Sequence, residues 1–266
     1  MIYFLAILSL IVVLPVAATV VWQRRSRASW TILLFALAAF AVNSAARLPL
    51  DRWLPQTMPF LDADPSLAPK LWPAAFLVML IYGLIREGIR WLTFRYAATN
   101  VRSWQEGVMF GLGYACLAVL VETTPLFSDL GAAANQVPDS AAEAMPDVPF
   151  SVWFMPVVLV TLDKGVVQTI FNVSTALTVM FSVQRRNLWL FLVAVLVYAV
   201  RAVLPSIALL YFPATQAGGQ DIPLHALAVS LPLTFLVTLL PVLLLYRLHK
   251  SGQSDGRSSD DRSLKS

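Results

Sequence analysis

The sequence predicts an all-α membrane protein, a polytopic bundle of about seven transmembrane helices. Hydrophobic residues make up 58% of the 266 positions and charged residues only 13%. A soluble globule of this length needs far more polar surface. Apolar runs also recur along the chain, each near the roughly 20 residues that a helix needs to cross a bilayer. We therefore expect one transmembrane helical domain over residues 1–250.

Seven apolar runs are predicted to span the membrane. In chain order they are residues 2–22, 30–46, 71–91, 108–121, 152–183, 188–210 and 224–246. The fifth run is long, and Asp163 and Lys164 interrupt it. We therefore expect residues 152–162 to form a short outer or re-entrant helix, bent at Pro156, before one full span. An eight-span arrangement is the alternative, and it would place Arg185 and Arg186 outside.

Basic residues predict the orientation, because Lys and Arg near span ends stay on the cytoplasmic side. They lie at or just after the ends of the first, third, fifth and last runs: Arg24, Arg25, Arg27, Arg86, Arg90, Arg95, Arg102, Arg185, Arg186, Arg247 and Lys250. Residues 122–147 contain acidic side chains and neither Lys nor Arg. The N-terminus is predicted outside the cell membrane and the C-terminus inside.

The C-terminal residues and the net charge bear on possible partners. Residues 251–266 are rich in Ser, Asp and Arg, so they bury too little apolar surface to fold and are predicted to form a disordered cytoplasmic tail. The net charge of +4 lies mainly at predicted cytoplasmic span ends. Topology and attraction to anionic headgroups explain it. We expect membrane lipid as a partner, and no nucleic acid.

The sequence predicts no metal site and no cofactor. Cys116 is the single cysteine and lies within an apolar run, which excludes an internal disulfide. His225 and His249 lie at opposite ends of the last run. One cysteine and two distant histidines make no usual ligand set for zinc.

Charged residues at the inner end of the third run are the first candidate site. An ionisable side chain at the centre of a membrane helix costs about 2.5 to 3.5 kcal/mol on insertion scales, so it usually has a functional reason. Arg86 and Arg90 are four residues apart, and Glu87 and Arg90 three apart. All three can share one helical face, with Glu87 held between two cations. A snorkelling ion pair at the interface is the alternative.

Three further polar residues are predicted to lie at one depth in the membrane. At 1.5 Å per residue, Tyr114, Asn172 and Tyr198 lie about 14, 17 and 15 Å from the inner ends of their runs. They can therefore face one another in a mid-membrane layer. The alternative for each residue alone is ordinary packing.

Arg201 is a candidate intramembrane charge site. It lies about 20 Å from Leu188 in an otherwise apolar run. A charge at that depth needs an anion or an aqueous cavity. Glu122 and Asp163 are the nearest acidic candidates by depth, and the sequence leaves the choice between them open.

The segments that carry these residues resemble the YhfC-type intramembrane peptidases, a family related in motif plan to the glutamic-type CAAX-processing proteases. The resemblance runs through residues 83–91, residues 102–114, Phe171-Asn172 and Val197-Tyr198-Ala199. The stretch Ser-Trp-x-x-Gly-x-Met-Phe-Gly, residues 103–111, is its most specific part.

The resemblance implies a catalytic glutamate and several histidines. In the related proteases the glutamate activates water, and the histidines position that water and stabilise the oxyanion. Glu87 and Arg90 match the first motif of the family. The chain departs from the family at the other motif positions. Arg86 stands where the family has a second glutamate, and Ala118 and Ala202 stand where further acidic side chains are usual. The histidines of the family are replaced by Tyr114, Asn172 and Tyr198.

These departures favour a non-catalytic relative that binds a membrane-protein segment or a lipid in the former active-site cleft. Tyrosine and asparagine donate hydrogen bonds, but near neutral pH neither accepts a proton from water as imidazole does. The first alternative is an active glutamic-type protease that uses Glu87, with Tyr and Asn as oxyanion donors. The second is a transporter for an anionic solute, which Arg201 and Arg86 would attract.

Overall fold

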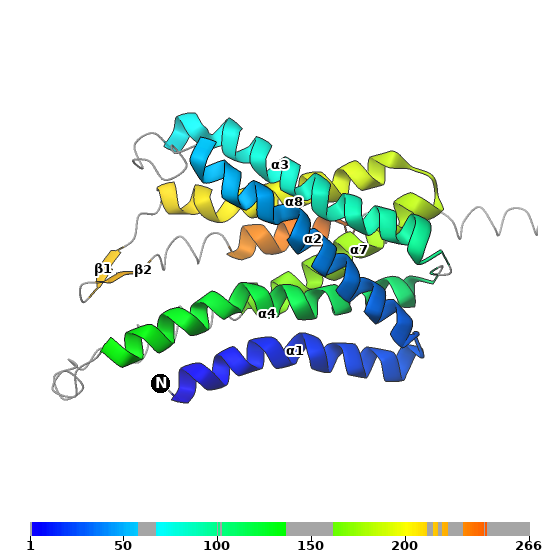
Figure 1. Ribbon diagram of the computed structural model, residues 1–266, viewed down its shortest axis with the longest axis horizontal. Helices are drawn as coiled ribbons and strands as arrows, with labels where there is room; N and C mark the ends of the chain where they lie inside the picture. Colours follow the sequence, from blue (N-terminus) through cyan, green and yellow to red (C-terminus); the bar gives the residue numbers. More distant parts are fainter. Residues whose placement is uncertain are drawn as a thin grey trace, which may run out of the picture.

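A computed structural model of the chain describes residues 2–57, 68–99, 101, 103–136, 162–211, 215–217, 220–222, 231–241 and 243. Every long element in these ranges is a helix, which confirms the predicted all-α membrane core (Figure 1). The predicted tail at 251–266, the predicted short helix up to residue 161, and both histidines lie outside the described residues.

Each helix overlaps an apolar run, but two of them continue more than ten residues past the predicted run ends at 46 and 121. The helices are α1 (Ile2–Ser26), α2 (Trp30–Thr57), α3 (Ala68–Leu92), α4 (Trp104–Gln136), α7 (Gln168–Gln184) and α8 (Leu188–Tyr211), with a further apolar helix at Leu231–Pro241. Two π-helical turns adjoin them, η3 (Thr93–Ala97) after α3 and η4 (Leu162–Val167) before α7. A short antiparallel hairpin of β1 (Thr215–Ala217) and β2 (Gln220–Ile222), which the sequence analysis did not predict, follows α8.

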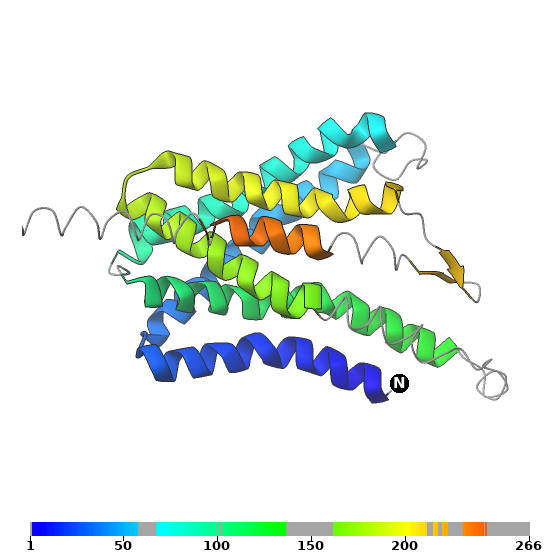
Figure 2. The ribbon, with the colours of Figure 1, turned by 180° about the vertical axis from the view of Figure 1, so that it is seen from behind.

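Helix α7 lies at the centre of the bundle. It packs against α4 on one side and against α3 and α8 on the other, while α1 and α2 cover α4. Figures 1 and 2 show α1 and α4 together on one side, with α3 and α8 on the other. Polar residues of α7 are buried along much of its length: Gln168, Thr169, Asn172, Ser174, Thr175, Thr178 and Ser182. Buried polar groups in an apolar bundle need partners, so α7 is the natural place for a polar site.

Glycines on α4 allow this helix to approach α7 closely. A Cβ atom on Gly111 would lie 2.5 Å from the Cα of Val173, and one on Gly107 would lie 2.7 Å from a methyl carbon of Leu177. The two glycines are four residues apart and share one face, the small-xxx-small pattern of closely packed membrane helices. This approach places Tyr114, one turn further along α4, beside the polar face of α7.

Three stretches within the described residues are long and apolar enough to cross a membrane: Trp30–Trp53, Trp104–Val121 and Leu162–Gln184. Large apolar side chains also point out of the bundle. Leu34 on α2 is 64% exposed and Leu196 on α8 is 49% exposed. Extensive exposed apolar surface of this kind marks contact with a membrane or a partner. The length of these helices, their apolar composition and this exposed apolar surface are typical of a membrane protein.

Candidate functional site

Helix α3 carries a buried ion cluster. Glu87 and Arg90 have no exposed surface, and Arg86 is only 5% exposed. Arg90 Nη1 donates to Glu87 Oε1 at 3.1 Å and to Oε2 at 3.2 Å, and Arg86 Nε lies 3.7 Å from Glu87 Oε1. The spacing along one helical face produces this arrangement. Such burial does not fit a snorkelling pair, whose charged ends would lie in water.

Helix α7 provides hydrogen-bond acceptors for both guanidinium groups. Asn172 Oδ1 accepts from Arg90 Nη2 at 2.7 Å and also from Arg86 Nη2. The Asn172 amide is oriented by its own donation to the Gln168 carbonyl oxygen at 2.9 Å. Thr175 Oγ1 accepts from Arg90 Nη1 at 2.6 Å. Thr175 was not among the predicted site residues, although its position three residues after Asn172 on the same helical face could have indicated it.

Aromatic rings enclose the two guanidinium groups. The Cζ atom of Arg90 lies 3.8 Å from the ring centroid of Tyr114, and Cζ of Arg86 lies 4.9 Å from that of Tyr198. Cation–π attraction of this kind is strongest where water is excluded. The structure thus brings Tyr114, Asn172 and Tyr198 together around Arg86. Within the described residues, however, the Tyr114 hydroxyl has no hydrogen-bond partner, so Tyr114 contributes its ring face to the cluster instead of the expected hydrogen bond.

A second charged cluster surrounds Arg201. Its Nη2 atom lies 3.5 Å from Asp163 Oδ1, and its Nη1 donates to the side-chain oxygen of Gln168. Asp163 Oδ2 also lies 4.0 Å from Lys164 Nζ. Of the two acidic candidates that the sequence offered, Asp163 is the partner that the structure shows for Arg201.

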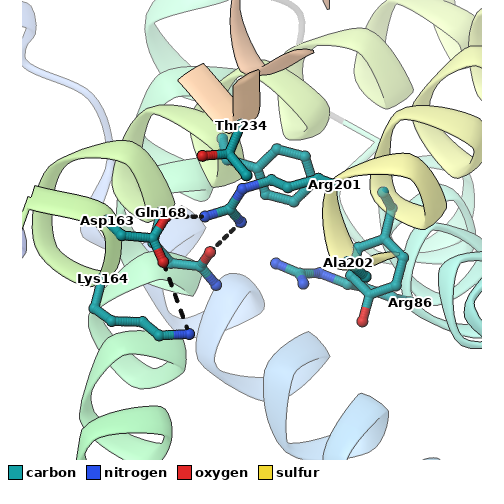
Figure 3. Close-up of a pocket in the computed structure, with 9 residues that line it drawn as sticks. Arg86, Asp163, Lys164, Gln168, Arg201, Ala202 and Thr234 are labelled. Atoms are coloured by element: carbon teal, nitrogen blue, oxygen red, sulfur yellow. Dashed lines mark hydrogen bonds and ion pairs between the residues drawn. The ribbon is translucent and has the colours of Figure 1, made fainter. Parts of the chain in front are cut away.

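A cavity of about 180 Å³ lies between the two clusters (Figure 3). Its charged lining comes from three elements: Arg86 on α3, Asp163 and Lys164 on η4, and Arg201 on α8. The remaining lining residues are Gln168, Phe171, Tyr198, Ala202 and Thr234. The lining therefore combines charged groups with aromatic and apolar ones.

Comparison with known protein families identifies the family of this chain. The sequence profile of the YhfC intramembrane metalloprotease family matches residues 10–216, most of the 266 positions. The chain belongs to the YhfC family. This confirms the resemblance drawn from its motifs, and the matched region includes both charged clusters. Searches of curated proteins and of solved structures gave no match.

The YhfC family description names a metal, but the cleft of this YhfC protein does not suit one. Among the described residues, Glu87 is the one carboxylate of the α3 cluster, and guanidinium groups face its oxygens. A divalent cation requires several anionic or neutral donors, and here it would lie against two fixed positive charges. Across the described ranges, no three His, Cys, Asp or Glu side chains come together as a ligand set.

The groups of this YhfC cleft are held in ion pairs and hydrogen bonds with one another. A general base must reach water or the substrate proton within hydrogen-bond distance. Glu87 is fully buried, and both of its oxygens accept hydrogen bonds from Arg90. The groups around it are guanidinium, amide, hydroxyl and phenol, which donate or accept hydrogen bonds but do not take a proton from water near neutral pH.

Proposed function

We propose that this YhfC family member is a non-catalytic relative that binds a lipid or a membrane-protein segment in the former active-site cleft. The observation that carries the proposal is the complete burial of Glu87, with both carboxylate oxygens held by Arg90. A glutamate in this state serves as the anion of a structural cluster. Activating water would require breaking the ion pair inside the bundle.

The cavity beside the cluster supports a binding role. Arg86 and Arg201 line it, and Phe171 and Tyr198 add aromatic rings to the lining. Clefts that combine an apolar wall with a few convergent polar groups are typical ligand sites. The cleft of a peptidase family is also suited to hold chain or acyl segments that lie within the membrane.

We also propose that the protein lies in the cell membrane as seven spans, with the N-terminus outside and the C-terminus inside. Two features support this topology. In Figure 1 the successive long helices run in alternating directions along one axis. In addition, Arg24 and Arg25 at the end of α1 lie at the same end of the bundle as Arg185 and Arg186 after α7. Basic residues gathered at one end are expected of the cytoplasmic side.

A photoreactive amino acid, para-azidophenylalanine, in place of Tyr198 tests the binding function. Tyr198 lines the cavity, and the azide takes little more space than the hydroxyl that it replaces, so irradiation of the purified protein should join it to one chemical species that was retained from the membrane. The matched control is the same amino acid in place of Leu34, which faces outward on α2. That position should give the mixture of bulk lipids present. A cavity position that yields no adduct, or only the bulk mixture, would contradict the proposal.

A transporter for an anionic solute is the second candidate, because three cationic side chains line the cavity: Arg86, Lys164 and Arg201. Transport requires the solute to cross to the other side of a sealed membrane. Uptake of an anion into proteoliposomes that contain the protein would favour the transporter, and binding without uptake would favour the proposal above.

A further inference from the structure

A second cavity lies at the end of the bundle where α3 and α7 end. Its volume is about 380 Å³, within the range of sites for small molecules and cofactors. None of its described lining residues also lines the cavity beside the α3 ion cluster. We propose that this second cavity binds the headgroup of an anionic phospholipid, with Arg95 and Arg186 as the residues that bind the phosphate. The proposal goes beyond the binding function of the former active-site cleft, because it concerns a separate site.

The lining of the second cavity combines two cations with aromatic and apolar side chains. Trp91, Arg95 and Tyr96 come from α3 and η3, and Arg186 and Leu188 come from the junction of α7 with α8. The Trp91 and Tyr96 rings pack edge to face, with their centroids 6.5 Å apart. Trp and Tyr are enriched at the level of the lipid headgroups, and basic cavities between membrane helices bind anionic headgroups. The cavity therefore has the composition of a headgroup site.

The charges of the lining favour an anionic headgroup over a zwitterionic one. Arg95 and Arg186 are the charged residues of the described lining. The ion pairs printed by the described structure lie in the two charged clusters, and none of them includes either arginine. A guanidinium group matches the oxygens of a phosphate with two parallel hydrogen bonds. A choline headgroup would place its ammonium group beside the same cations, so phosphatidylglycerol should bind better than phosphatidylcholine.

A π-helical turn brings Arg95 to the cavity. In η3, Ala98 N donates to the Thr93 carbonyl oxygen at 2.7 Å, across the five-residue interval of a π turn. Such turns are frequent at functional sites. Arg95 and Tyr96 on this turn are both exposed, so a headgroup can reach them from the membrane surface.

The backbone of Arg186 allows its side chain to be removed without strain. Its φ is 52°, in the left-handed region that favours glycine. Arg186 N donates to the Val183 carbonyl oxygen at 3.3 Å, and Asn187 N donates to that of Ser182 at 2.9 Å. These two bonds form a Schellman motif at the end of α7, in which glycine is the usual residue at the position of Arg186. Glycine at this position should therefore preserve the fold while it removes the guanidinium.

Apolar side chains next to the lining suit the rest of the lipid. Leu188, which lines the cavity, is 63% exposed, and Leu92, the residue after Trp91, is 51% exposed. Exposed apolar side chains of membrane helices contact acyl chains. A lipid can therefore place its headgroup in the cavity and its acyl chains along the bundle.

Photocrosslinking from inside the cavity tests the proposal on the full chain. Para-azidophenylalanine replaces Tyr96, and the protein is irradiated in nanodiscs that contain equal amounts of phosphatidylglycerol and phosphatidylcholine. Phosphatidylglycerol adducts should exceed phosphatidylcholine adducts about fivefold or more, because each basic side chain near a headgroup contributes about that factor. The control position is Trp189, which is 75% exposed, follows Leu188 and lies outside the described lining. Its adducts should have the ratio of the bulk lipids.

Two glycine variants separate the cavity from general surface charge. Arg186→Gly should lower the preference for phosphatidylglycerol about fivefold, while the midpoint of thermal unfolding stays unchanged or rises. Arg27→Gly is the matched control, because Arg27 is also exposed, has a φ of 55° and follows α1 outside the described lining. It should keep the preference. Arg95→Gln removes the second cation of the cavity and should lower the preference as Arg186→Gly does.

Several outcomes would overturn the proposal. These are an equal lipid ratio at positions 96 and 189, no lipid adduct at position 96, or an unchanged preference in both Arg186→Gly and Arg95→Gln. An equal loss in Arg27→Gly and Arg186→Gly would assign the preference to surface charge and overturn the site as well. Adducts at position 198 report on the other cavity, so each of these outcomes leaves the proposed function of the cleft standing.

Discussion

Replacing Arg90 with methionine is expected to lower the free energy of unfolding by about 3 to 5 kcal/mol, the range for removing one partner of a buried ion pair. Arg90 has no exposed surface and donates hydrogen bonds to Glu87, Asn172 and Thr175. Methionine fills much of the same volume but leaves the Glu87 carboxylate buried beside Arg86 alone. The measurement is unfolding of the purified protein in mixed micelles as the fraction of denaturing detergent rises.

Two comparisons make this prediction specific. Arg95→Met, in the exposed part of η3, should change the free energy of unfolding by less than about 0.5 kcal/mol, as surface substitutions usually do. The double variant Glu87→Gln, Arg90→Met removes both charges, so its cost should be smaller than the sum of the two single costs. Equal effects of Arg90→Met and Arg95→Met, or additive single costs, would show that no buried cluster exists.

Gly111→Ala is expected to destabilise the protein by about 1 to 3 kcal/mol, the usual cost of inserting a methyl group into a well-packed interior. The new Cβ atom would lie 2.5 Å from the Cα of Val173. Because that atom belongs to the backbone, α4 and α7 must move apart, and no side-chain rotation relieves the contact. Val173 adjoins Asn172, so the displacement should also disturb the acceptor for both arginines.

Gly88→Ala is the matched control for Gly111→Ala. Gly88 lies within α3, and a Cβ atom there would meet no other atom within 4 Å. Alanine favours a helix over glycine by roughly 0.5 to 1 kcal/mol, so Gly88→Ala should leave stability unchanged or raise it. The two variants are compared by detergent unfolding as above. A neutral Gly111→Ala would contradict the close contact between α4 and α7.

The ion cluster was largely predictable from sequence, because it depends on local spacing. Arg86, Glu87 and Arg90 are three and four residues apart, and any helix places them on one face. The meeting of Asn172 and Tyr198 at this cluster was also expected, because the 1.5 Å rise per residue gives them similar distances from the inner ends of their runs. The burial of the three charges could not be predicted from the sequence, because burial depends on how α7 and α8 pack against α3.

Tertiary packing explains most of the remaining differences between the predicted site and the observed one. Thr175 shares a helical face with Asn172, but its bond to Arg90 depends on how α3 and α7 are docked. The Tyr114 ring, and not its hydroxyl, contacts the guanidinium of Arg90, a distinction that residue type alone cannot make. The hairpin had a local signal that was overlooked, since Gly218-Gly219 connects two short polar segments.

The central claim is that Glu87 is a structural anion and that the protein does not cleave membrane proteins. The most direct test compares the N-termini of the membrane proteome in three cell lines: one with the intact protein, one with Glu87→Gln and one without the protein, each checked for expression. The account predicts the same set of termini in all three. New termini that appear with the intact protein and disappear in Glu87→Gln would contradict it and establish proteolysis.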